Sequence, residues 1–186
     1  MNRIPFPAAM TPAVALALIA APAAAHVTVA DATAAPGAYH AAFFQLSHGC
    51  DGSPTVALRI EIPAEVSIAR PQPKPGWSLA VETAPLDQPR EVEGVAVHDR
   101  VAAVTWRGRL EADQFDRFGI MLRLPDRTGP VYLPAVQTCE NGENRWVDIP
   151  AAGAAWGSVP HPAPVIEIGA PAAAAPAVDH AHHHGG

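Results

Sequence analysis

The clearest pattern along the chain is a strict alternation of apolar and polar residues that begins at Thr55. Apolar side chains recur at every second position and charged ones stand between them: Val56, Leu58, Ile60 and Ile62 against Arg59 and Glu61. A period of two places alternate side chains on opposite faces of a strand. The segment is therefore predicted to be a half-buried β-strand.

Shorter apolar runs, bounded by turn-forming residues, predict further strands. They cover residues 26–30, 38–46, 78–82, 92–97, 101–106, 115–124, 131–138, 145–149 and 165–168. No helical period is sustained along the chain. Many short strands with turn signals roughly every 8–12 residues predict an all-β protein with an immunoglobulin-like or fibronectin-III-like β-sandwich fold.

The segment from Arg70 to Trp77 carries proline at alternate positions, which favours extended, polyproline-like geometry. One interpretation is a proline-rich ligand for another domain. The favoured interpretation is a rigid connector that packs Trp77 against the body of the protein.

The first 25 residues have the features of a secretory signal peptide. Arg3 supplies a positive charge, residues 13–20 form a short apolar run, and Ala23 and Ala25 form an Ala-x-Ala cleavage site directly before His26. The apolar run is too short to span a bilayer. We expect cleavage before His26, a periplasmic or secreted product, and no transmembrane anchor in it.

Composition restricts the possible partners, and the roughly 160 residues left after cleavage predict one domain. The 12 Lys and Arg against 18 Asp and Glu give a formal charge of −6, and no basic cluster is present, so nucleic acid is not an expected partner. The 21 prolines and 14 glycines are typical of a β domain with many turns. The predicted organisation is a signal peptide at 1–25, one domain at 26–169 and a tail at 170–186.

The tail is rich in alanine and proline and is predicted to be disordered. It ends in a histidine cluster that could bind metal loosely as an auxiliary site: His180, His182, His183 and His184. Two interpretations are open: a tail that scavenges metal, and a solvated segment with no role in metal binding.

Cys50 and Cys139 are the two cysteines of the chain. In an oxidising compartment they are predicted to form a disulfide. The alternative, a Cu(I) thiolate site, is disfavoured because the two lie far apart in sequence without another Cys or Met close by.

A histidine at the first mature position has a specific chemistry. Its α-amine and its imidazole Nδ1 can chelate one metal ion, and nitrogen and oxygen donors suit Cu(II). Cleavage before His26 would therefore create a two-donor copper site from one residue. Chance placement of a histidine after the cleavage site is the alternative.

Several motifs, taken in order, resemble the YcnI-type family of secreted copper-binding domains. They are residues 26–29 (HVTV), 47–53 (SHGCDGS), 71–77 (PQPKPGW), 104–106 (VTW), 133–140 (LPAVQTCE), Arg145-Trp146, Ile149-Pro150 and 162–164 (PAP). The resemblance covers nearly all of residues 26–168. It implies an immunoglobulin-like sandwich, one Cu(II) ion held by the N-terminal histidine, and a role in copper handling beside other periplasmic copper carriers or transporters.

Carried onto this sequence, the resemblance assigns His26 as the copper ligand and places Trp146 near the metal. It also implies a carboxylate ligand, for which Asp116, Glu140 and Glu143 are alternatives. Asp116 lies in a strand where relatives carry an acid just before a phenylalanine, although Arg117 departs from that pattern.

Two other functions are open. A copper redox enzyme of the histidine-brace type would need a second imidazole from His40, His48, His98 or His161, and no ligand spacing in the sequence selects one of them. Hydrolase motifs such as Gly-x-Ser-x-Gly are also lacking, so we expect no enzymatic activity. A metal-free structural β-sandwich is the third possibility.

Overall fold

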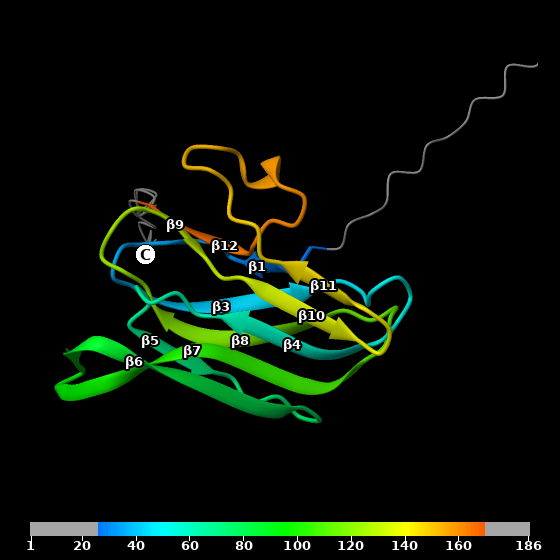
Figure 1. Ribbon diagram of the computed structural model, residues 1–186, viewed down its shortest axis with the longest axis horizontal. Helices are drawn as coiled ribbons and strands as arrows, with labels where there is room; N and C mark the ends of the chain where they lie inside the picture. Colours follow the sequence, from blue (N-terminus) through cyan, green and yellow to red (C-terminus); the bar gives the residue numbers. More distant parts are fainter. Residues whose placement is uncertain (1–25, 170–186) are drawn as a thin grey trace, which may run out of the picture.

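The computed structural model describes residues 26–169, which form three β-sheets and one short 3₁₀ helix (Figure 1). The first sheet has the order β1-β3-β8-β5, the second β11-β10-β4-β7-β6 and the third β2-β12-β9. The strands are β1 Thr28–Ala30, β2 Thr33–Ala34, β3 Tyr39–Leu46, β4 Thr55–Glu61, β5 Ile68–Pro71, β6 Ser78–Val92, β7 Val95–Leu110, β8 Asp116–Arg123, β9 Gly129–Tyr132, β10 Ala135–Cys139, β11 Glu143–Trp146 and β12 Val165–Ile168; the helix η1 is Trp156–Ser158.

The two larger sheets pack face to face, and their inward side chains form the core. Buried side chains alternate along β3 and β4, as in Phe44 and Leu46 on β3 and Leu58 and Ile60 on β4. Trp106 of the second sheet meets Phe118 of the first at 5.4 Å between ring centroids. The predicted all-β sandwich is confirmed.

One predicted strand is divided between two sheets. Residues 131–138 were expected to be continuous, but β9 pairs with β12 and β10 pairs with β4 and β11. Pro134 lies between β9 and β10 and has no amide hydrogen to donate to a ladder. The chain therefore changes sheets at this proline.

The predicted strand at 92–97 is wrong, because a hairpin turn interrupts it. Glu93 and Gly94 both have positive φ, at 52° and 80°, and Val92 pairs with Val95 across the turn. Two central residues with positive φ match the twist of a two-residue hairpin. The turn joins β6 and β7, which are much longer than the predicted strands 78–82 and 101–106.

The proline-rich segment packs on the body, as predicted for a connector, although its first residues also form β5 at the edge of the first sheet. The Trp77 ring meets Phe118 edge-on at 4.9 Å, and the Trp106 indole donates a hydrogen bond to the Gln72 carbonyl. Within residues 26–169, no helix combines the length and apolar character needed to cross a membrane.

The predicted disulfide between Cys50 and Cys139 is present and buried. It joins the loop after β3 to the end of β10. Beside it, the buried Gln137 amide donates to the His48 carbonyl at 2.9 Å and to the Thr55 hydroxyl at 2.8 Å. The polar groups next to the disulfide are thus hydrogen-bonded, as buried polar groups require.

Candidate functional site

His26 lies two residues before β1, and its imidazole packs against two indoles. The ring centroid lies 4.6 Å from that of Trp146 and 5.3 Å from that of Trp156. The next residues anchor it, because Val27 and Val29 are buried in the core. The first residue of the described chain therefore has a defined, half-buried position.

Trp146 reaches this position because β11 alternates between the two faces of its sheet. Trp146 is 4% exposed, whereas Glu143 and Arg145 are exposed on the opposite, outer face. The Trp146 indole nitrogen is buried and has no hydrogen-bond partner among the described residues. A buried indole N–H usually has an acceptor, so this donor is available to a bound group.

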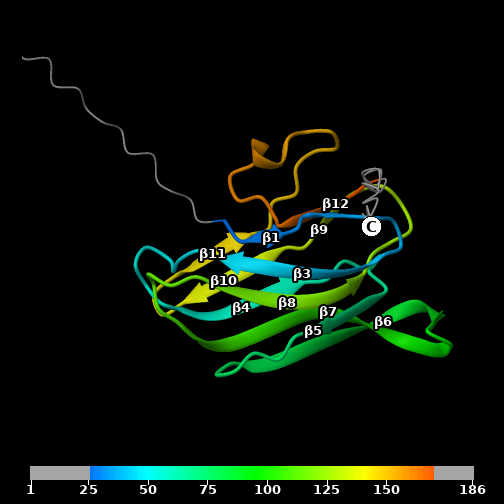
Figure 2. The ribbon, with the colours of Figure 1, turned by 180° about the vertical axis from the view of Figure 1, so that it is seen from behind.

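The segment after β11 covers this end of the sandwich. Residues 150–162 rise over β1 and β11 in both views (Figures 1 and 2). Trp156 lies in η1 within this segment, and its indole donates to the Ala163 carbonyl at 2.7 Å. This bond holds Trp156 beside the His26 ring.

Asp148 and His161 lie at the base of the same segment. The amide of His161 donates to the Asp148 carboxylate at 3.0 Å, and the Nδ1 atom lies 3.6 Å from the same oxygen. The His161 ring lies 5.9 Å from Trp146 between centroids. His161 was one of four histidines named from the sequence, without a partner, and Asp148 was not predicted as a site residue. The local sequence offered only prolines as a sign that the chain turns here: one on each side of His161, and the Ile149-Pro150 pair after Asp148.

The structure brings His26 and Trp146 together but places the three candidate acids in ion pairs. Asp116 accepts a hydrogen bond from Lys74 at 2.7 Å, on β8, which β3 separates from β1. Glu140 pairs with Arg109.

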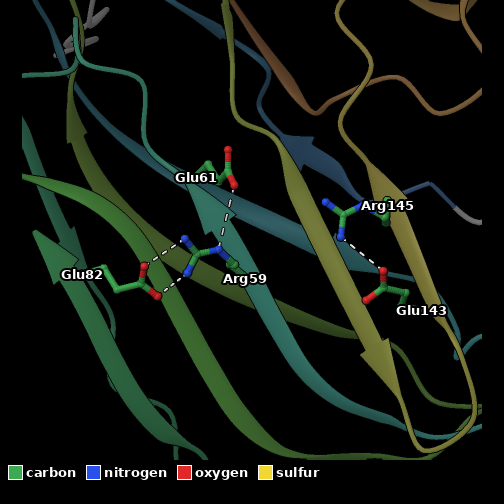
Figure 3. Close-up of polar contacts among 5 residues, drawn as sticks. All are labelled: Arg59, Glu61, Glu82, Glu143 and Arg145. Atoms are coloured by element: carbon green, nitrogen blue, oxygen red, sulfur yellow. Dashed lines mark hydrogen bonds and ion pairs between the residues drawn. The ribbon is translucent and has the colours of Figure 1, made fainter. Parts of the chain in front are cut away.

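Glu143 lies 3.2 Å from Arg145 (Figure 3). The alternation along β11 places both on the face opposite to Trp146. Nearby on the same outer face, the Arg59 guanidinium pairs with Glu82 and Glu61. The Arg59 partner holds the pKa of the Glu82 carboxyl below its usual value. The charged side chains named on this face are therefore paired with opposite charges.

Within the described residues, no group of three or more His, Cys, Asp and Glu side chains is arranged to hold a metal ion. A chelate formed by the amine and imidazole of one histidine needs no such cluster. The predicted cleavage segment and the tail histidines His180, His182, His183 and His184 lie outside the described residues.

Comparisons with known proteins identify a family and a fold. The sequence profile of a family described as a domain of unknown function (DUF1775) matches residues 26–168. The chain is also similar to an uncharacterized protein from Nocardia farcinica whose crystal structure has an immunoglobulin-like fold. The two are 30% identical with a TM-score of 0.58, and the alignment covers 77% of this chain and 97% of that one. No curated protein matches the chain.

Proposed function

The chain belongs to the DUF1775 family, and from its own residues we propose that it is a Cu(II)-binding protein that acts in copper trafficking or buffering in the periplasm or outside the cell. The YcnI-type resemblance is consistent with that family. In this proposal the mature chain begins at His26, whose α-amine and Nδ1 hold the ion. The protein carries copper and is not an enzyme.

The observation that carries the proposal is the fixed position of His26 between Trp146 and Trp156. The ends of domains are usually poorly ordered unless they are tied down. Here the residue that cleavage would expose is held by two indoles, and the family match begins at the same residue. A chelating residue with a defined position loses less conformational entropy when it binds.

The surroundings of His26 suit a metal ion with open positions. The unpartnered Trp146 N–H would be satisfied by an acceptor bound to the metal, such as a water or a carboxylate. A carboxylate from Asp116, Glu140 or Glu143 would first have to leave its cation. The pairs of Glu140 and Glu143 are exposed, and such pairs are worth only about 0–1 kcal/mol, so their release costs little. The Asp116–Lys74 pair is partly buried and costs more to separate.

The test is Cu(II) titration of the mature chain, followed by electron paramagnetic resonance. The four tail histidines are replaced by asparagine, so that they cannot compete. We expect one tight equivalent, and about 2.7 kcal/mol of added stability at a hundredfold excess over the Kd.

The decisive variant carries one additional alanine before His26, which moves the amine away from the imidazole. It should lose the tight equivalent, whereas the control variant His98→Ala, which removes an exposed histidine on β7, should keep it. Equal weak binding by the parent and the extended variant would contradict the proposal.

A further inference from the structure

Asp148 and His161 are two side chains with metal-ligating chemistry that the His26 chelate does not use, and His161 shares the neighbour Trp146 with His26. Both side chains line a surface hollow of about 370 Å³, together with Glu143, Asn144, Arg145 and Val147. The side chain of His161 is 61% exposed. The imidazole is therefore accessible from solvent.

The backbone holds the two residues in a fixed register. The Asp148 amide donates to the His161 carbonyl at 2.9 Å, and the Ala163 amide donates to the Asp148 carbonyl at 2.9 Å. Asp148 also forms a parallel bridge with Pro162. Two residues that are distant in sequence are thus preorganised next to each other.

The carboxylate lies on the Nδ1 side of the His161 ring. Histidines that bind metal commonly give their other ring N–H to a carboxylate, which fixes the tautomer and orients the ring. The contact of 3.6 Å between Nδ1 and Asp148 is longer than a hydrogen bond, but it places the acid where it would select the tautomer with a free Nε2. Neutral Nε2 is a good ligand for copper.

His161 and His26 are both ring neighbours of Trp146. The centroid distances to the indole are 4.6 Å for His26 and 5.9 Å for His161, so the two imidazoles are no further apart than the sum of these values. Other histidines lie in different surroundings. His48 contacts the Gly49 carbonyl near the disulfide, and the Nε2 of His40 is buried.

The geometry points to His161, oriented by Asp148, as an exchange ligand that binds Cu(II) in transit between the His26 chelate and its surroundings. The inference rests on the proposed function. An ion leaves a chelate faster when an incoming donor takes an open position before the first bonds break. His161 supplies that donor at the solvent-exposed side, and the hollow leaves room for a competing ligand.

The test measures how fast copper leaves the loaded protein. The mature chain with asparagine in place of the tail histidines is loaded with one equivalent of Cu(II) and mixed with excess EDTA, and the loss of visible absorbance is followed by stopped flow. We expect His161→Ala to slow release at least tenfold and Asp148→Asn to slow it to a smaller extent. His98→Ala is the matched control and should release copper at the parental rate.

A second readout separates exchange from structure. Free imidazole added to His161→Ala should restore fast release, whereas it should change the parental rate little. The paramagnetic resonance spectrum at equilibrium should be the same in both proteins, because His161 is not a resident ligand. His161→Gln, which retains a polar side chain of similar length, replaces His161→Ala if the latter melts at a lower temperature.

The outcomes distinguish this inference from the proposed function. Equal release rates in His161→Ala and His98→Ala would overturn the inference while leaving the chelate intact. A changed equilibrium spectrum in His161→Ala would also overturn it, because His161 would then be a permanent second imidazole of a histidine brace. Absence of a tight equivalent in the parent protein would overturn the proposed function itself.

Discussion

Replacing both Cys50 and Cys139 with alanine is expected to lower the free energy of unfolding by about 4–5 kcal/mol. The disulfide closes a loop with a sequence separation of 89 residues. The chain-entropy relation gives about 4.6 kcal/mol at 25 °C for a loop of about 90 residues. In this relation the cross-link acts by lowering the entropy of the unfolded chain, so its removal should change the folded structure little.

Alanine is the appropriate substitution because both cysteines are only 4% exposed. The Cys139 sulfur accepts a hydrogen bond from the Cys50 amide at 3.1 Å, but that amide also donates to the Ser53 carbonyl at 3.1 Å and keeps this partner in the variant. The hydrogen bonds from Gln137 to His48 and Thr55 do not involve sulfur and should survive. The measured change therefore reports chiefly on the cross-link.

Denaturation by urea with linear extrapolation measures this difference, and the m-value should rise because the unfolded chain expands. The parent protein in a strong reductant should approach the stability of the variant, whereas the variant should not respond to the reductant. A loss below about 1 kcal/mol would refute the loop-closure argument and indicate that the reduced chain retains structure in its unfolded state.

Two further predictions concern titration and packing. Burial lowers the pKa of the His40 imidazole more than Asp31 raises it. As the pH falls, the unfolded chain therefore takes up the proton first, so stability should decrease below about pH 6.5 and level off below the folded pKa. Thermal melts between about pH 7.5 and 5 should show this decrease. The same dependence of melting temperature on pH in His40→Leu would contradict the argument. A Cβ on Gly49 would overlap the Ser53 carbonyl oxygen, so Gly49→Ala should cost about 1–3 kcal/mol in urea denaturation. Gly157→Ala, where no atom is near, is its control, and an equal effect of the two would refute the packing argument.

Strand positions were predictable where one local rule was sufficient. The alternation from Val56 to Ile62 follows from burial on one face, and the structure pairs Thr55–Glu61 on both sides. The hairpin turn at Glu93 and Gly94 was missed because valines on both sides continue the strand pattern, and glutamate seldom takes a positive φ. The division at Pro134 depends on which sheet each half joins, and this is a property of tertiary pairing.

The candidate site shows the same limit more sharply. His26 and Trp146 were selected from the sequence, the first from a cleavage motif and the second from a resemblance, and they do pack together. Asp148 and His161 were not connected, because the bonds that join them arise only when the segment between β11 and β12 folds back on itself. Local spacing cannot report a contact that depends on such closure. Sequence spacing therefore finds metal ligands chiefly where they lie within one strand or loop. In this fold the groups around His26 come from β11 and from both ends of the segment that follows it.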